Sequence, residues 1–261
     1  MRKKPTRQTQ RSLDVQVDRW GTVRGVGDVS GTLSQEKAIR GRVVAVAERD
    51  RSFKDDVDGH NGLLYGVLDQ TFGDGTRVTL GGLLQNQQDT PDPYGLPLSS
   101  TGGDLRLPRD TFLGMRWNEG RYRKQNAFVE VDHYLDDNWN LNVKVDYRRT
   151  FSVQEYASLA GSGSLGGGVS ADGLLPLDGI QRTFQANVNG AFQALGRQHE
   201  AFVTYSYTRE RLDIRDRSED TDDRSFNIYT FTGYEVPLPN WSVYDFQSFV
   251  HNNFTTHGLA A

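Results

Sequence analysis

The sequence predicts an all-β fold, an antiparallel meander in which each strand pairs with the strand before it. Apolar and polar residues alternate with a period of two through most of the chain, and no segment carries the 3.6-residue stripe of an amphipathic helix. Glycine is frequent at 28 residues while proline is rare at 8, a balance that suits many strands joined by turns. The third observation is that short and long connections alternate along the chain between these segments.

The alternation defines nine strands and the start of a tenth. In the clearest strand, Trp139, Leu141, Val143 and Val145 occupy one face and polar side chains occupy the other. The predicted strands are 13–17, 23–33, 39–47, 61–72, 77–85, 127–135, 139–148, 184–192 and 201–208, with a tenth begun at 255–261. Most of them are roughly ten residues long, the length of a tilted strand that crosses a membrane.

Composition excludes several classes of protein. The 30 basic and 34 acidic residues give a net charge of -4, so no basic surplus attracts nucleic acid. The absence of cysteine excludes disulfides, zinc–thiolate sites and thiol nucleophiles. No run approaches the ~18 consecutive apolar residues of a transmembrane helix. The basic start at 2–4 is not followed by an apolar segment, and we therefore expect no export signal in the sequence as written.

The connections indicate an outer-membrane barrel. The short ones are 34–37, 73–75, 136–138 and 195–198. The long ones are 51–60, 86–118, 154–179 and 213–253. Long loops are uncommon in compact soluble domains, whereas tight periplasmic turns at one end and long extracellular loops at the other are typical of transmembrane barrels. Phe72, Trp139 and Phe192, with Leu135, lie beside the short turns, where an interfacial girdle is expected.

The two faces of the strands then have different surroundings. The face with Val78, Leu80 and Leu84, which continues in the apolar positions of 139–145, is expected to be convex and to contact lipid. The face with Arg77, Lys144, Asp146 and Gln185 is expected to be concave and to line the lumen.

Several motifs make the family recognisable. They are RWGTVRGVGDVSGTL (19–33), IRGRVVAVAERDRSFKD (39–55), LLYGVLDQTF (63–72), PDPYGLPL (91–98), LPRDTFLG (107–114) and AFVEVDHYLDDNWNLNVKVDYRR (127–149). With these motifs the chain resembles TonB-dependent siderophore receptors of the ferrichrome, pyoverdine and pseudobactin type.

The resemblance implies a barrel of about 22 strands whose lumen is plugged by an N-terminal domain. The family has a Lys/Arg-Lys/Arg-Pro-Thr element where plug meets barrel, and Lys3-Lys4-Pro5-Thr6 matches it. Residues 1–10 are therefore expected to be the end of the plug and the plug–barrel junction. Residues 11–261 are expected to be the N-terminal part of the barrel, about nine to ten strands. The chain would then be a truncated fragment that is not functional alone.

The resemblance also implies the function: uptake of a ferric siderophore across the outer membrane of a Gram-negative bacterium, with no catalysis. The siderophore is a transported ligand, and no resident cofactor or metal is expected. The implied partners are the siderophore, the TonB-ExbB-ExbD complex and outer-membrane lipid, with no nucleic acid. The sequence does not identify the siderophore.

Three aromatic residues are the candidate ligand contacts. Tyr94, within PDPYGLPL, matches the place where hydroxamate receptors of the family present an aromatic ring to the chelate, and Tyr156 has a similar place in the next long loop. Phenol rings combine an apolar face with a hydroxyl group, which suits a ferric chelate. Trp117 is a third candidate, although a membrane–interface anchor explains it equally well. Each of them could instead pack within its own loop.

Two other functions remain open. A complete ten-stranded barrel enzyme of the protease or lipase type would need paired Ser/His or Asp/His groups at its rim. The five histidines have no metal-ligand spacing, and no GxSxG motif is present. A soluble glycan-binding β-protein would not need long loops at one end only. The acidic loop 213–223 lacks the residue order of a calcium loop, and we interpret it as a solvated surface.

Overall fold

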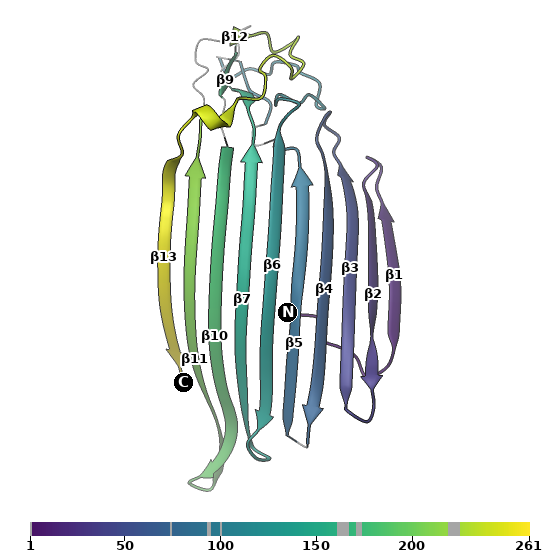
Figure 1. Ribbon diagram of the computed structural model, residues 1–261, viewed down its shortest axis with the longest axis vertical. Coiled ribbons are helices and arrows are strands. Elements are labelled where there is room, and N and C mark those ends of the chain that lie inside the picture. Colours follow the sequence, from purple (N-terminus) through teal and green to yellow (C-terminus); the bar gives the residue numbers. More distant parts are fainter. Residues whose placement is uncertain are drawn as a thin grey trace.

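Ten strands form one antiparallel sheet in which neighbours in the chain are neighbours in space (Figure 1). The computed structural model describes residues 2–73, 75–92, 95–99, 101–160, 167–170, 174–218 and 225–261. In spatial order the strands are β1 (Gln10–Val17), β2 (Val23–Ser34), β3 (Ile39–Arg51), β4 (Asp58–Phe72), β5 (Thr76–Asp89), β6 (Glu119–Tyr134), β7 (Trp139–Glu155), β10 (Leu174–Ala194), β11 (Arg197–Asp216) and β13 (Gln247–Ala260). The predicted antiparallel meander is confirmed. The sheet is open, with β1 and β13 at its edges.

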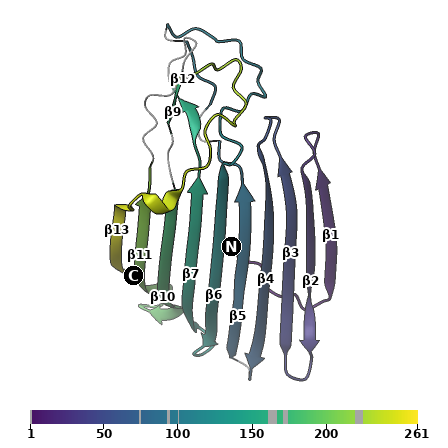
Figure 2. The same ribbon diagram turned by 45° about the horizontal axis from the view of Figure 1, so that its top comes forward.

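The long connections carry the remaining elements. A small sheet of β8 (Ser158–Ala160), β9 (Gly167–Ser170) and β12 (Ser225–Phe226) lies beyond one end of the main sheet (Figure 2). A 3-10 turn, η1 (Trp241–Val243), precedes β13. Among the described residues, no helix has the length and apolar character needed to cross a membrane.

The two faces of the main sheet differ as predicted. On one of them, which we call the polar face, Asp28, Asp69 and Thr79 are only 7%, 3% and 2% exposed although no second sheet covers them in the described part of the chain. On the opposite face, the apolar face, Leu80 and Val145 are 50% and 51% exposed. Side chains converge on the inner side of a curved sheet and spread apart on the outer side. The polar face is therefore the concave one.

Aromatic side chains pack together on the apolar face near the short turns. The rings of Trp139 and Phe192 stack with centroids 6.5 Å apart, and Phe192 stacks on His199 at 5.5 Å. The Trp139 ring lies over Gly190, where an added Cβ would be 2.1 Å from the indole. A glycine is required there because any side chain would displace the ring.

The strand boundaries differ from the sequence prediction. The strands run to 21 residues in β10 and 20 in β11, roughly twice the predicted length. β13 begins at Gln247, where a loop to residue 253 was expected. Backbone pairing continues past the apolar band, where alternation is no longer imposed by lipid, and the pattern alone could not show the extra length.

We predict that residues 1–261 alone do not form a stable membrane-inserted species. The outer edges of β1 and β13 have no neighbouring strand in the sheet, and each unpaired backbone group costs several kcal/mol in hydrocarbon. After refolding in detergent, the chain should show no compact form whose gel mobility changes on heating. A compact, heat-modifiable species would contradict the prediction.

Candidate functional site: the loop assembly and the N-terminal segment

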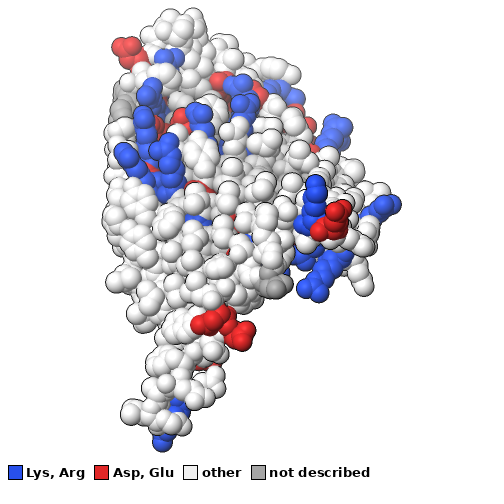
Figure 3. Space-filling model, turned by 60° about the horizontal axis from the view of Figure 1, so that its bottom comes forward, with Lys and Arg blue, Asp and Glu red and all other residues white. Residues whose placement is uncertain are grey.

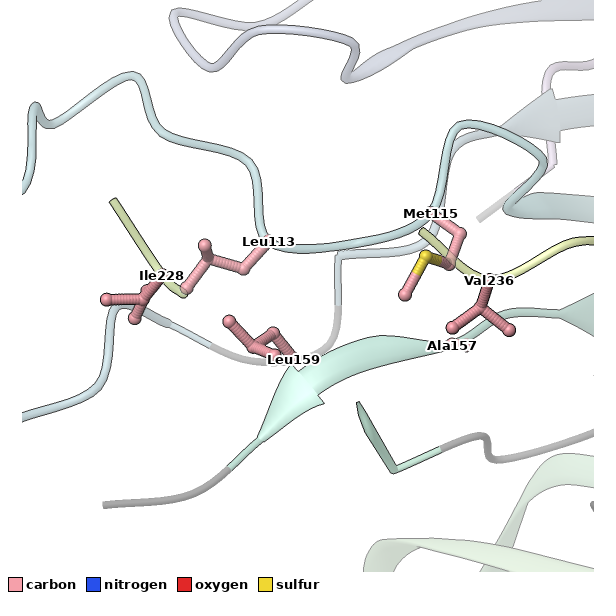
Figure 4. Close-up of a cluster of buried hydrophobic side chains, with 6 residues drawn as sticks. All are labelled: Leu113, Met115, Ala157, Leu159, Ile228 and Val236. Atoms are coloured by element: carbon pink, nitrogen blue, oxygen red, sulfur yellow. The ribbon is translucent and has the colours of Figure 1, made fainter. Parts of the chain in front are cut away.

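The long connections pack against one another and form a loop assembly with its own core. Six buried side chains from the β5–β6, β7–β10 and β11–β13 connections make up this core: Leu113, Met115, Ala157, Leu159, Ile228 and Val236 (Figure 4). Met115 and Ala157 are fully buried. The backbone joins the first two connections, because Met115 donates to the Ala157 carbonyl at 3.1 Å and Leu159 donates to the Leu113 carbonyl at 2.8 Å.

Asn118 is the polar centre of the loop assembly. It is 5% exposed, at the residue before β6. Its Nδ2 donates to the carbonyls of Pro91, at 3.2 Å, and Ala157, at 3.1 Å, and its Oδ1 accepts from the Ala157 N–H at 2.9 Å. One side chain therefore joins the start and end of the β5–β6 connection to the β7–β10 connection. The sequence does not single out Asn118, because no pattern distinguishes it from other loop asparagines.

The β3–β4 connection is joined to the loop assembly by charged groups. Arg116 donates to Asp56 with 2.6 Å between Nη1 and Oδ1, and Lys54 pairs with Asp92. The Asp55 N–H also donates to the Asp110 carbonyl at 2.9 Å. Through the β5–β6 connection, the four long connections are thus linked at one end of the sheet, and their length alternation predicted that they share an end.

A tight turn at Thr232–Glu235 closes the β11–β13 connection. The Glu235 carboxylate accepts hydrogen bonds from the Thr232 and Gly233 N–H groups, at 2.7 and 2.8 Å. Partial burial opposes the ionised form, but these hydrogen bonds outweigh it and hold the pKa of Glu235 below its usual value. Gly233 has a φ of +82°, a conformation that favours glycine.

Two of the three predicted ligand residues lie in described parts of the loop assembly. Trp117 is half-buried, packs against the apolar core and donates from Nε1 to the Val236 carbonyl at 2.9 Å. Tyr156, also half-buried, precedes the buried Ala157. Trp117 precedes Asn118 in the chain, and Tyr156 precedes Ala157. Because Asn118 is hydrogen-bonded to Ala157, Trp117 and Tyr156 lie on neighbouring segments. Tyr94 lies outside the described residues, three positions after Pro91, whose carbonyl Asn118 binds.

The described part of the acidic loop and the histidines add no further site. Asp213 and Asp216 belong to β11, while the acidic residues at 219–223 lie outside the described residues. His133 lies in β6, with its Nδ1 2.8 Å from the Thr76 hydroxyl. The described ranges contain no group of three or more His, Asp or Glu that could hold a metal ion.

The N-terminal segment, residues 2–9, crosses the polar face of the sheet. Three of its cations meet carboxylates from three separate strands. Arg2 pairs with Asp146 of β7, Lys3 with Asp28 of β2 at 2.8 Å, and Lys4 with Glu130 of β6 at 3.4 Å. These acids are largely buried, with side chains 8% to 15% exposed. A buried carboxylate without a partner is costly, and the segment therefore supplies charge that the polar face needs.

Contacts other than ion pairs hold the same segment along its length. The Tyr65 hydroxyl donates to the Lys3 carbonyl at 2.7 Å, and Arg42 donates to the Lys4 carbonyl at 3.1 Å. The Arg2 guanidinium lies 3.9 Å from the centroid of the Phe128 ring. Tyr65 and Phe128 belong to a small apolar cluster on the polar face with Val44 and Val67. The N-terminal segment covers this cluster and so shields apolar surface that would otherwise face the lumen.

The comparison with curated proteins shows what class of protein this architecture belongs to. No family model matches the chain. The ferric-pyoverdine M114 receptor PbuA of Pseudomonas sp. (strain M114) is 33% identical over 207 residues, which are 77% of this chain and 25% of that protein. The ferric-pyoverdine 358 receptor of Pseudomonas putida is 27% identical over 251 residues, 92% of this chain and 30% of that protein. The chain thus spans about a quarter to a third of these relatives.

Solved structures share the fold. The ferripyoverdine receptor of the outer membrane of Pseudomonas aeruginosa, bound to ferripyoverdine, matches with a TM-score of 0.87 at 21% identity, over 99% of this chain and 35% of that one. The ferric-catecholate import receptor Fiu of E. coli K12 matches with a TM-score of 0.75 at 17% identity, over 87% of this chain and 38% of that one.

These findings confirm the predicted resemblance. The sheet has the fold of an outer-membrane siderophore-receptor barrel. More particularly, the chain is a homologue of the ferric-pyoverdine receptors, which it matches along a part of their length. These relatives are receptors, in agreement with the expectation that the chain is not an enzyme, and none of them is a barrel hydrolase or a glycan-binding protein.

We predict that Asn118→Ala loosens the loop assembly and leaves the sheet intact. The change removes three hydrogen bonds and leaves the buried Ala157 N–H without its acceptor. The unsatisfied N–H should lower the stability of the loop assembly by about 1–3 kcal/mol. The test uses a hybrid receptor, in which this chain replaces the matched part of the P. aeruginosa ferripyoverdine receptor. Limited proteolysis of the folded hybrid should nick the loops faster in the variant.

Asn138→Ala is the matched control, because Asn138 is exposed in the short β6–β7 turn. Equal loop cleavage in Asn118→Ala and Asn138→Ala, with both hybrids folded, would show that Asn118 does not hold the loops together.

Proposed function

We propose that this chain forms the first part of the wall of an outer-membrane receptor that imports a ferric siderophore of the pyoverdine class. The observation that carries the proposal is the 33% identity to a ferric-pyoverdine receptor over 77% of the chain. The fold supports it, since one face of the sheet suits lipid and the other suits a polar lumen. The iron chelate is the transported cargo, and the chain supplies no catalytic group.

The N-terminal segment supports the proposed division of the chain. Residues 1–10 are the end of a plug domain and its junction with the barrel, and residues 11–261 are wall. Three basic residues in a row pair with acids of three strands on the polar face. A domain that precedes this segment would be placed inside the lumen. The TonB-ExbB-ExbD complex is the proposed source of energy for moving that domain.

The loop assembly is the proposed entrance. Tyr94, Tyr156 and Trp117 are the proposed ligand contacts, and Asn118 links the three segments that carry them. The Trp117 indole N–H is already bonded to Val236, and its contribution would therefore be the ring face. Tyr156, next to the buried core, would be positioned by the packing of Ala157.

We predict that the hybrid receptor imports ferric pyoverdine and that loop aromatics are needed for it. Pseudomonas cells that lack their own receptor would carry the hybrid, and uptake of radioactive iron would be measured for a panel of ferric pyoverdines and for a ferric catecholate. At least one pyoverdine should be imported. Tyr94→Ala and Tyr156→Ala should weaken chelate binding several-fold, because each removes a ring with a hydroxyl group from the entrance.

Tyr147→Ala is the control, because Tyr147 lies on the apolar face and is 37% exposed there. It should leave chelate affinity unchanged. A folded, surface-exposed hybrid that imports none of the pyoverdines would contradict the proposed function. Unchanged affinity in Tyr94→Ala or Tyr156→Ala would remove that tyrosine from the proposed contacts.

A further inference from the structure

A cleft of about 690 Å³ opens on the apolar face, toward the short-turn end of β2 to β5. Its walls include Val43, Leu68 and Leu80, whose side chains are 41% to 51% exposed. Its floor consists of glycines that pair in register on adjacent strands, Gly31 with Gly41 and Gly66 with Gly82. We call this depression, with its floor and walls, the glycine cleft.

The glycine cleft is narrow over one glycine and open over another. At Gly41, an added Cβ would be 2.9 Å from Leu33 Cδ1 and 3.0 Å from Leu68 Cδ2, because these two side chains lean over the glycine. At Gly66, an added Cβ would meet no atom within 4 Å. The apolar side chains therefore enclose a depression whose open part lies over β4.

The later strands fill the corresponding positions with large side chains. The register row that contains Leu68 and Leu80 continues through Val129, Val145 and Phe184. A hydrocarbon chain on that part of the face would touch the protein on one side only. A chain in the glycine cleft would touch the floor and both walls, and attraction by dispersion increases with the number of atoms in contact. The glycine cleft is therefore the part of the apolar face best shaped to hold one chain in place.

Arg11 of β1 lines one end of the glycine cleft. It pairs in register with Val29 and is exposed. Within the described ranges, no carboxylate lies within 4.0 Å of its guanidinium group. The other arginine of the lining, Arg42, is bonded to Asp28 on the polar face. Arg11 thus supplies a positive charge that the described part of the chain does not neutralise.

Arg11 marks the short-turn boundary of the apolar band on β1. The next residues on the same face of β1 are Leu13, Val15 and Val17, which are 62% to 78% exposed. Figure 3 shows a broad uncharged surface with Lys and Arg side chains gathered at its margins. Arginine at such a boundary keeps its charge in the polar layer while its stem covers apolar surface. A lipid places its head group at the same level.

We propose that the glycine cleft binds an acyl chain of an anionic phospholipid of the periplasmic leaflet, and that Arg11 binds the phosphate of the same lipid. The guanidinium group offers paired donors that match phosphate oxygens. The proposal rests on the proposed function, because that function places the apolar face in a membrane and the short turns on the periplasmic side.

The combination of an apolar cleft with an unpaired cation selects this occupant. A free phosphate ion would gain nothing from the walls at Leu68 and Leu80. A second copy of the chain would bring no phosphate group to Arg11. Only a molecule that is apolar along one part and anionic at its end matches both features, and a membrane supplies phospholipids of this kind.

The experiment measures lipid binding to the folded hybrid receptor in neutral detergent. Dipalmitoylphosphatidylglycerol is the probe, and the comparisons are dipalmitoylglycerol, which lacks the phosphate, and inorganic phosphate alone. Gly66→Leu fills the open part of the glycine cleft. Gly62→Leu is the matched control, because Gly62 lies on the same face of β4, has the same open space above it and does not line the cleft.

A second pair of variants tests the charge. Arg11→Gln removes the cation at the end of the glycine cleft. Arg197→Gln is its control, because Arg197 is exposed on the same face of the sheet beside the β10–β11 turn. Folding of every hybrid is verified first by heat-modifiable gel mobility. Should Gly66→Leu not fold, the comparison of Arg11→Gln with Arg197→Gln decides the outcome.

The phosphatidylglycerol should bind equally to the unmodified hybrid and to both controls. It should bind about tenfold more weakly to Gly66→Leu, which loses the space for the chain, and to Arg11→Gln, which loses the phosphate contact. The lipid without phosphate should bind more weakly than the probe. Its binding should be weakened further by Gly66→Leu and unchanged by Arg11→Gln.

Equal binding of the phosphatidylglycerol to Gly66→Leu and Gly62→Leu, or to Arg11→Gln and Arg197→Gln, would overturn the proposal. Displacement of the lipid by inorganic phosphate at equal concentration would also overturn it. A dimer of the hybrid that Gly66→Leu dissociates would assign the glycine cleft to a second copy instead. Failure of the unmodified hybrid to fold would count against the proposed function.

Discussion

A strand that crosses hydrocarbon must bond each of its backbone N–H and C=O groups to a neighbouring strand, because no water is present to replace those bonds. The eight inner strands meet this requirement by pairing on both sides in chain order, whereas the edge strands β1 and β13 are paired on one side only. Once the backbone is paired in this way, only the side chains on each face can vary. The two-residue period then divides every strand between lipid and lumen, and this division sets where each charge in the molecule can lie.

The polar face depends on charge brought from outside the sheet. Asp28 and Glu130 are buried there, and cations of neighbouring strands satisfy them in part, as Arg42 does for Asp28 at 2.6 Å. The N-terminal segment supplies the rest through Lys3 and Lys4. The segment is thereby tied to three strands at once. On the opposite face, arginines gather at the loop end, at the boundary of the apolar band.

Sequence pattern was sufficient for the features that alternation controls. It predicted the strand order, the two faces and the end at which the long loops gather, because lipid contact imposes a strict period on residues such as 139–148. It failed at residues 247–253, where a strand was interpreted as loop, because strand pairing beyond the apolar band tolerates any polar residue. The sequence motifs made the family recognisable, whereas no motif predicted the contacts between the loops.

The candidate site was predictable only in part for the same reason. Aromatic residues in long loops pointed to Tyr156 and Trp117, but the contacts that place them come from Asn118, a residue that no periodicity marks. The pairing of Lys3 with Asp28 crosses 25 positions of sequence and depends on how the chain enters the sheet. The sequence did contain a signal for these ion pairs. The basic run at 2–4 and the acids at polar-face positions have opposite charges, and they could have been matched on that ground.

The central claim is that the apolar face contacts lipid and the polar face lines the lumen. The chain has no cysteine, and single cysteines can therefore be placed at adjacent positions of β7, Lys144→Cys on the polar face and Val145→Cys on the apolar face. Spin labels on these cysteines, in a cysteine-free hybrid receptor reconstituted into membranes, report collisions with oxygen and with a water-soluble nickel chelate. We expect the label at residue 145 to collide more often with oxygen than with the nickel chelate. The label at residue 144 should show no such excess of oxygen collisions. Equal profiles, or oxygen-dominated collisions at 144 alone, would contradict it.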